Sequence, residues 1–241
     1  MASLGTPPAT LVDTRLALHR LATYVIAPAR YRKTEKFGLR AVDGGFGTPP
    51  FAGRQIAVVG NQIIDRHDGQ DDKTEAITSL AGAAAFLGET IDEVTAAEHD
   101  SPAVGSQGED LHVDEAASLW LGSWYAMAFD ALHELRNDKE SVDGSEPQLW
   151  PGHFDPAIEA GDDAHRGSYG ASPGDASSDE PYLYLGIWWP DRLSLDTKDP
   201  FWNASSFVGA QKPVSEFVDA ADPAAEALNF WRTARDHLAA G

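Results

Sequence analysis

The stretch Glu-Pro-Tyr-Leu-Tyr-Leu-Gly-Ile-Trp-Trp-Pro, residues 180–190, decides the predicted fold because it reads as a β-strand. Successive side chains of a strand point to opposite faces of the sheet. One face then carries Tyr182, Tyr184, Gly186 and Trp188, and the other carries Leu183, Leu185, Ile187 and Trp189. Both sets are apolar or aromatic, which predicts a strand that is covered on both sides and lies in the interior of its sheet.

A second informative stretch, Gln-Leu-Trp-Pro-Gly-His-Phe-Asp-Pro at residues 148–156, precedes this strand. If the segment is extended, its period of two places His153 and Asp155 on one face and Phe154 on the other. The flanking prolines make the segment short and stiff, and such a segment can aim side chains into a cleft. A histidine beside a carboxylate is typical of general acid–base chemistry, so these two residues are the catalytic candidates. The Gly-, Ser- and Asp-rich passage 169–179 is predicted to be a turn.

The remaining elements come in blocks of strands and blocks of helices. Strands are expected at residues 37–42, in a hairpin at 55–64 around Gly60-Asn61, and at 213–218. Helices are expected at residues 11–27 (ended by Pro28), 74–87 (capped by Thr74), 113–136 and 223–238 (capped by Asp222). Blocks of this kind argue against a doubly wound sheet. The predicted fold is α+β, with a mostly antiparallel sheet packed against about four helices.

Length and composition fit one domain over residues 1–241, since 42% of the 241 residues are hydrophobic. The segment 1–10 is expected to be flexible, and the polar segment 137–147 is expected to be an internal loop or linker. Cysteine is absent, so disulfides and thiolate sites are excluded. The first ten residues lack the basic and apolar regions of a signal peptide, and no apolar run is long enough to cross a membrane. These features predict a cytoplasmic protein without a membrane partner.

The formal net charge of −20 predicts a surface that repels phosphate backbones, so nucleic acid is not expected as a partner. Against this background, five basic residues gather in a short segment: Arg30, Arg32, Lys33, Lys36 and Arg40. One interpretation is an anion clamp that includes Arg30, because guanidinium groups pair well with carboxylates and phosphates. The alternative is that these charges neutralise neighbouring acidic residues.

No cofactor is predicted. The glycines of residues 44–47 do not have the spacing of a dinucleotide-binding turn, and no phosphate-binding Gly-Lys-Ser/Thr motif occurs. No metal site is predicted either, because the sequence indicates no third ligand beside His153 and Asp155. Asp130, His133 and Glu134 form a carboxylate–histidine–carboxylate set on a predicted helix, which could be catalytic and is more commonly an exposed helix end.

Two hypotheses about function remain open. In the first, the protein is a small-molecule binding protein or an enzyme with an aromatic-lined cleft, in which His153 and Asp155 act as acid and base. The expected ligand-binding residues are Trp150, Tyr169, Asp175, Tyr182, Tyr184, Trp188, Trp202 and Arg30. In the second, His153 and Asp155 cap backbone groups in a tight bend, and the aromatic residues are core. The protein is then a structural or interaction module, with a homodimer formed through exposed aromatic side chains as one form of it.

Several motifs together resemble a family of uncharacterised proteins from actinobacteria. They are Leu-Trp-Pro-Gly-His-Phe-Asp at 149–155, Tyr-Gly-Ala-Ser-Pro-Gly-Asp at 169–175, Glu-Pro-Tyr-Leu-Tyr at 180–184 and Asp-Pro-Phe-Trp-Asn at 199–203. The loop Gly-Gly-Phe-Gly-Thr-Pro-Pro-Phe at 44–51 is similar to the amino-terminal half of that family. The resemblance implies a shared fold over most of residues 11–238 and brings no established activity.

Overall fold

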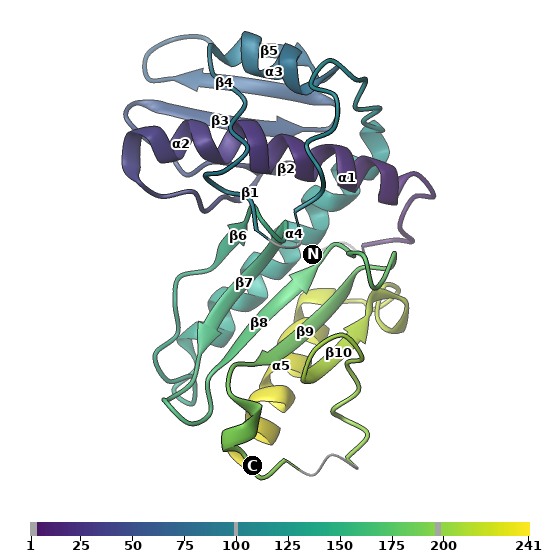
Figure 1. The fold of residues 1–241 in the computed structure, drawn as a ribbon. Coiled ribbons are helices and arrows are strands. Elements are labelled where there is room, and N and C mark those ends of the chain that lie inside the picture. Colours follow the sequence, from purple (N-terminus) through teal and green to yellow (C-terminus); the bar gives the residue numbers. More distant parts are fainter. Residues whose placement is uncertain (1–3, 99–100, 196–198) are drawn as a thin grey trace. The chain divides into compact units, whose positions relative to one another are not determined.

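The computed structural model describes residues 4–98, 101–195 and 199–241, and it confirms the α+β class (Figure 1). Within these residues the strands form two five-stranded antiparallel sheets, where a single sheet was expected. The chain divides into two compact units, which we call the N-unit (Pro7–Ala126 and Leu149–Asp155) and the C-unit (Met127–Gln148, Pro156–Gly241 and the segment before Pro7). The predicted linker, residues 137–147, lies inside the C-unit.

The N-unit contains a meander sheet in the order β1-β2-β3-β4-β5. Its strands are β1 (Arg40–Val42), β2 (Gly45–Gly47), β3 (Arg54–Val59), β4 (Gln62–His67) and β5 (Lys73–Ala76). Its helical elements are α1 (Leu11–Leu21), the π-helical turn η1 (Ala22–Ile26), α2 (Ala27–Thr34), α3 (Leu80–Leu87) and the first half of α4 (Glu115–Asn137). The hairpin predicted at Gly60-Asn61 is confirmed. Strands β3 and β4 are antiparallel, and Val59 and Gln62 form the pair next to the turn.

The first helical segment is longer than predicted, because Pro28 does not end it. A proline inside a helix leaves the carbonyl four residues earlier without a donor. Here that carbonyl belongs to Tyr24, and it accepts a hydrogen bond of 2.9 Å from the backbone N–H of Asp92. The π-helical turn η1 ends at Ile26, two residues before Pro28, and the chain continues as α2 to Thr34.

Two predictions in the N-unit were wrong in detail. Residues 73–76 form the exposed strand β5, and the helix starts only at Leu80, where the Ser79 hydroxyl accepts a 3.0 Å hydrogen bond from the Gly82 N–H. The Gly-rich loop 44–51 contains strand β2. Gly45 is required there because an added Cβ would lie 1.8 Å from the Val58 carbonyl oxygen of β3.

The C-unit contains most of the second sheet, in the order β10-β9-β8-β7-β6. These strands are β6 (Gln148–Trp150), β7 (Asp155–Ala160), β8 (Gly167–Ser172), β9 (Tyr182–Ile187) and β10 (Gly209–Pro213). Two short 3-10 turns, η2 (Pro190–Arg192) and η3 (Val214–Glu216), and helix α5 (Pro223–Ala239) follow β9 in the chain. The strand predicted at 213–218 therefore lies four residues earlier, and Tyr169–Ser172 belong to β8, where a turn was expected.

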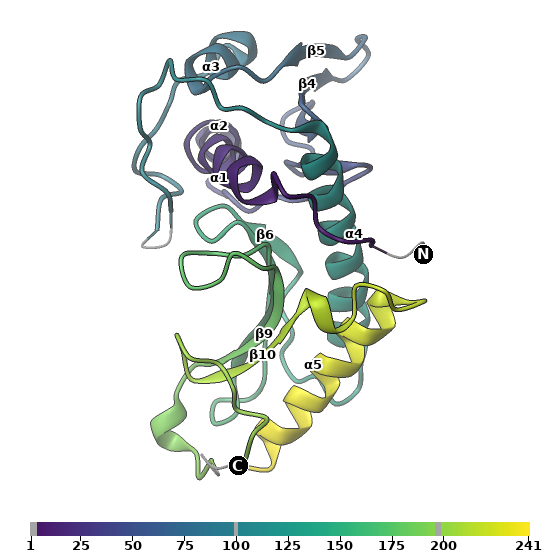
Figure 2. The ribbon, with the colours of Figure 1, turned by 90° about the vertical axis from the view of Figure 1, so that its right-hand side faces the viewer.

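The prediction for residues 182–187 is confirmed, since β9 lies between β8 and β10. Leu183 and Leu185 are fully buried, and α5 packs along β9 (Figure 2). The indole N–H of Trp231 on α5 donates a 3.1 Å hydrogen bond to the Tyr184 carbonyl. Asp222 caps α5 as predicted, accepting a 3.1 Å hydrogen bond from the Ala225 N–H.

None of the helices in the described parts of the chain combines the length and the apolar character that a membrane span requires.

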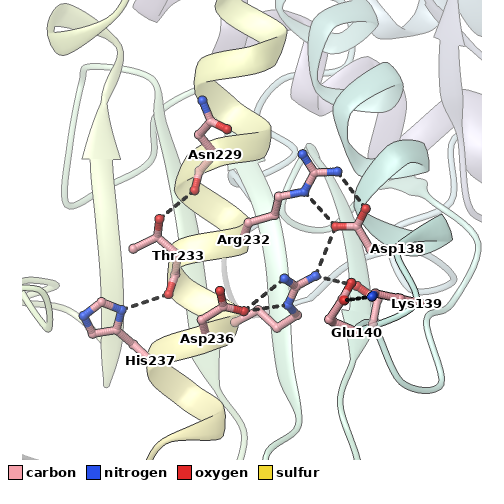
Figure 3. A network of polar contacts seen from close by, with 10 residues as sticks. Asp138, Lys139, Glu140, Asn229, Arg232, Thr233, Asp236 and His237 are labelled. Carbon is pink, nitrogen blue, oxygen red and sulfur yellow. Dashed lines mark hydrogen bonds and ion pairs between the residues drawn. The ribbon is translucent and has the colours of Figure 1, made fainter.

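Two arginines of α5 bind one carboxylate directly after the end of α4 (Figure 3). The Arg232 guanidinium donates two hydrogen bonds of 2.7 Å to Asp138, and Arg235 donates one of 3.1 Å. The hydrogen bonds from Arg232, followed by those from Arg235, lower the pKa of Asp138 below its ordinary value. This shared ion pair fastens the turn after α4 to the second half of α5.

We expect Asp138→Asn to lower the free energy of unfolding by about 1 kcal/mol at pH 7, because the half-exposed Arg232 is partly screened by solvent. Since the pKa of Asp138 is lower in the folded than in the unfolded chain, the difference should be present above pH 3.8 and shrink as the pH falls below that value. Urea unfolding at several pH values measures both effects. The matched control, Asp236→Asn, removes a more exposed partner of Arg235 and should change stability by less than about 0.5 kcal/mol.

Candidate functional site

The Pro151–Asp155 loop is held in the N-unit through its main-chain carbonyls. Thr23 donates a 2.6 Å hydrogen bond to the Pro151 carbonyl, and Tyr125 donates one of 2.9 Å to the Phe154 carbonyl. The Gly152 carbonyl lies 3.0 Å from His19 Nε2, which must carry the proton because a carbonyl can only accept. These bonds come from α1, η1 and α4, so three helical elements determine the loop's conformation.

Phe154 anchors the same loop through its ring. The ring is fully buried, stacks on His19 at 5.2 Å, and meets Phe46 and Tyr125 edge-on at 5.1 and 5.5 Å. Its φ of 59° is in the left-handed region, which costs a non-glycine residue of the order of 1 kcal/mol or more. The aromatic packing around the ring offsets this strain, because fully burying a phenylalanine contributes roughly 1.5–3 kcal/mol.

The left-handed residue has a direct consequence for the two catalytic candidates. His153 and Asp155 would share a face only if Phe154 were extended, and it is not. The His153 side chain is 34% exposed, whereas Asp155 is 5% exposed. The structure therefore places the two candidates in different surroundings.

His153 pairs with a carboxylate that the sequence did not indicate. Its Nε2 lies 2.8 Å from Glu98 Oε2, and both side chains are about one-third exposed. Gly152 makes this approach possible, since an added Cβ would lie 2.7 Å from Glu98 Cγ. A carboxylate at this distance fixes the orientation of the imidazole.

Asp155 lies in the interior near Tyr125. Burial raises the pKa of the Tyr125 hydroxyl well above its ordinary value, and the negative charge of Asp155 raises it further. Tyr125 therefore stays protonated and acts as a hydrogen-bond donor to the loop. This arrangement agrees with a structural role for Tyr125.

His19 is neutral in the folded protein. Burial lowers its pKa from 6.5 to about 4, and this effect outweighs the hydrogen bonds to the Gly152 and Pro151 backbone that raise it. His19 and Thr23 are four residues apart on the first helical segment and lie beside its apolar stripe. This spacing is the one signal in the sequence for their role. π-helical turns such as η1, which carries Thr23, are frequent at functional sites.

Three of the candidates, Tyr182, Tyr184 and Trp188, lie on one face of the C-unit sheet. Together with Phe207, which was not predicted, they form what we call the aromatic face. The ring centroids of Tyr182 and Tyr184 are 6.2 Å apart, and those of Tyr184 and Phe207 are 6.0 Å apart. Pairing of Gln211 with Tyr184 and of Ser168 with Gly186 adds two polar side chains to this face. Leu183 and Leu185 lie on the opposite face, as predicted.

The rings of the aromatic face lie close to the sheet because glycines stand beneath them. A Cβ added to Gly170 would be 2.5 Å from Cζ of Tyr184, so the tyrosine ring extends across that glycine. Gly186 has a similar relation to Phe207, with an added Cβ at 3.9 Å from the ring. The Tyr184 and Phe207 rings meet edge-on, with an angle of 71° between their planes.

Trp188 is the most exposed ring of this face, with 39% of its surface accessible. Its indole N–H donates a 2.8 Å hydrogen bond to Ser168 Oγ, and the Arg166 guanidinium lies 5.1 Å from the ring centre. Arg166 is itself bonded to the Gly161 carbonyl at 3.0 Å and lies 3.6 Å from Glu159. The indole is therefore held in one orientation although it is exposed to solvent.

Asp175 lies at the edge of the aromatic face. The Tyr182 hydroxyl donates to its Oδ2, and Ser177 and the Ser178 N–H donate to its Oδ1. Burial disfavours the charged form, but these hydrogen bonds outweigh it and lower the pKa of Asp175. Asp175 is thus an ionised carboxylate that shapes the loop between β8 and β9.

The other predicted ligand-binding residues lie elsewhere. Tyr169 pairs with Leu185, so it occupies the opposite face of the sheet, where it is 2% exposed. Trp202 packs edge-on against Phe201 at 5.2 Å, and the Phe201 ring stacks on His237 of α5. Arg30 and Trp150 belong to the N-unit. The Arg30 guanidinium donates to the Gly38 carbonyl, and the Trp150 ring lies 6.1 Å from the Phe37 ring.

The carboxylate–histidine–carboxylate set on α4 lines a small open cavity in the C-unit. Its volume is about 340 Å³, and Asp130, His133 and Glu134 face Asp222 and Leu228 of α5 across it. Asp222 is engaged as the cap of α5. In residues 4–98, 101–195 and 199–241, no group of three or more histidine, aspartate or glutamate side chains is placed to hold a metal ion.

Comparison with family models, with curated proteins and with solved structures found no match for this chain.

The burial of His19 predicts a pH-dependent stability. Because the pKa of His19 is lower in the folded than in the unfolded chain, its contribution is complete above pH 6.5 and is lost as the pH falls toward 4. The loss should amount to roughly 3 kcal/mol, measurable by urea unfolding across this range. His19→Gln should flatten the dependence. The control His112→Asn, at an exposed histidine, should leave it unchanged, and an unchanged slope in His19→Gln would contradict the assignment.

We expect Tyr125→Phe to lower the free energy of unfolding by about 1–2 kcal/mol, because the buried Phe154 carbonyl loses its hydrogen-bond donor. Thermal or denaturant unfolding measures the loss. Tyr31→Phe, at an exposed tyrosine of the same unit, is the control and should have little effect. Equal stability of Tyr125→Phe and the wild type would mean that this bond does not hold the loop.

Proposed function

We propose that the protein is a small-molecule binding protein whose ligand stacks on the aromatic face of the C-unit. The observation that carries the proposal is the fixed, exposed indole of Trp188, which is held by Ser168 and Arg166 on the face that also carries the partly exposed rings of Tyr184 and Phe207. Ligand sites are lined mainly by apolar and aromatic side chains, with a few polar groups that fix the orientation of the ligand. Residues Tyr182, Tyr184, Trp188 and Asp175 of the predicted binding set belong to this site.

The charges near the aromatic face favour a neutral ligand. Arg166 is next to Glu159, and Asp175 already accepts several hydrogen bonds, so neither requires a counter-ion from a ligand. Ser168 and Gln211 offer hydrogen bonds without charge. A ring with hydroxyl groups, such as a pyranose sugar, fits this combination, because its apolar side stacks on aromatic rings while its hydroxyls bond to polar side chains.

The proposal is tested by saturation-transfer NMR with a panel of neutral mono- and disaccharides. We expect binding that Trp188→Ala weakens by about tenfold or more, because an aromatic contact contributes about 0.5–1.5 kcal/mol beyond its buried area. Gly170→Ala should also weaken binding, since it displaces the Tyr184 ring while it retains every aromatic residue.

Trp150→Phe is the matched control, because Trp150 is a partly exposed tryptophan of the other unit. Binding that is lost equally in Trp188→Ala and Trp150→Phe would place the ligand away from the aromatic face. The absence of binding by every sugar of the panel would reject the proposed ligand class.

A second candidate function is general acid–base catalysis by His153, favoured by its 2.8 Å contact with Glu98 at an exposed position. In this proposal Glu98 takes the role of orienting carboxylate, which had been assigned to Asp155. A cytoplasmic location is part of both proposals and rests on the absence of cysteine.

The alternative is a non-catalytic interaction module, with a homodimer as its simplest form. His153→Ala distinguishes the two. A partly exposed ion pair contributes less than about 1 kcal/mol, so a nearly unchanged melting temperature favours a catalytic site. A loss of several kcal/mol would show that His153 supports the architecture and would reject the catalytic proposal.

A further inference from the structure

The segment from Arg30 to Arg40 in the N-unit is basic in a strongly acidic chain. It contains five of the 18 lysine and arginine residues and one carboxylate, Glu35, whereas the whole chain has a net charge of −20. With 38 aspartate and glutamate residues available, most cations of this protein should find an acidic partner. The ion pairs of this segment decide between an anion clamp and simple neutralisation.

Among the residues that the structure describes, only Arg32 of this segment has acidic partners. Its guanidinium lies 2.5 Å from Glu89 and 3.9 Å from Asp92. Arg30, Lys33, Lys36 and Arg40 form no ion pair with any residue that the structure describes. Neutralisation by neighbouring acidic residues therefore accounts for one of the five charges.

The carboxyl end of α2 explains one of the four cations that have no acidic partner among the described residues. A lysine in the last turn of a helix is stabilised by the exposed carbonyls at that end, which explains Lys33. Lys36 and Arg40 lie beyond the helix; Arg40 Nε donates a 3.3 Å hydrogen bond to the Ala41 carbonyl. The Arg30 guanidinium donates to the Gly38 carbonyl, but its Nε is buried without a hydrogen-bond partner. Burial also lowers the pKa of Arg30.

Two aromatic residues, Tyr31 and Phe37, alternate with these cations along the chain, and Trp150 lies beside Phe37. The Phe37 ring lies 6.3 Å from Tyr31 and 6.1 Å from Trp150, so the rings form a short row. Tyr31 is 36% exposed, and Phe37 and Trp150 are partly exposed. Reciprocal backbone bonds of 2.8 and 2.9 Å between Leu39 and Leu149 hold Phe37 next to Trp150.

We infer that this basic–aromatic surface binds a compact phosphorylated ligand with a planar ring, of the type of a nucleoside phosphate. A row of partly exposed rings supplies a stacking position, and the unpaired cations supply charge for a phosphate dianion. A ligand with a single carboxylate carries one negative charge and would leave most of the positive charge of this surface without a partner. A long polyanion is disfavoured because the acidic remainder of the chain repels charges that extend beyond the surface.

This inference is independent of the proposed function, since it concerns other residues in the other unit. It gives a common role to Arg30 and Trp150, which the sequence analysis selected separately. It also assigns the anion clamp to Arg30, Lys36 and Arg40. Arg32, which is already paired, and Lys33, which the end of α2 stabilises, are left out.

The test is an NMR titration of the full chain with adenosine monophosphate, adenosine and inorganic phosphate. We expect the monophosphate to shift backbone signals of residues 30–40 and 149–150, and to bind more tightly than either of its parts. Lys36→Glu should weaken this binding about five- to tenfold through the reversed charge. Phe37→Leu should weaken it through lost stacking.

Lys73→Glu is the matched control. Lys73 is an exposed lysine of the same unit, also without an ion pair to a described residue, and the substitution changes the net charge equally. If Lys36→Glu and Lys73→Glu weaken binding equally, the effect comes from the net charge of the protein and not from this surface, and the inference is overturned. So would equal binding of phosphate and the monophosphate, the absence of binding, or far tighter binding of a single-stranded oligonucleotide, which would identify a nucleic-acid surface.

Discussion

The Phe154 ring and the backbone next to it are the constraint on which the N-unit depends. The residue adopts a left-handed conformation that is unfavourable by itself, and it is kept there by three surrounding rings and by the Tyr125 hydroxyl bond to its carbonyl. The same packing requires a neutral His19, because the imidazole is buried against Phe154 and donates to the Gly152 carbonyl. One buried ring therefore links the conformation of the loop, the protonation of a histidine and the position of His153.

The conformation of Phe154 separates the two candidate catalytic residues of the Pro-Gly-His-Phe-Asp sequence. The prolines do not aim two catalytic groups side by side, because the left-handed Phe154 turns the chain between them. His153 remains at the surface with Glu98, and Asp155 enters the interior at the start of β7. The hydrogen bonds that stabilise the bend come from side chains distant in the sequence, and for this reason the loop itself gave no indication of them.

The two proposed ligand sites differ in their electrostatics. On the aromatic face of the C-unit, the nearby charged groups Arg166 and Asp175 have partners, so stacking and neutral hydrogen bonds remain for a ligand. On the basic–aromatic surface of the N-unit, four cations remain without an acidic partner among the described residues. The ligand proposed for the C-unit is therefore neutral, and the one proposed for the N-unit is an anion.

The sequence by itself determined the elements whose signals are local. The alternation in residues 182–187, the Gly60-Asn61 hairpin and the Asp222-Pro223 helix start all follow from side-chain periodicity, turn chemistry and capping, which need no distant partner. Tertiary structure decided the rest. Pro28 is tolerated because Asp92 supplies a donor to Tyr24, Gly45 belongs to a strand because β3 lies against it, and the strands divide between two sheets. The pairing of Glu98 with His153 joins two residues that are far apart in the chain and that only folding brings together.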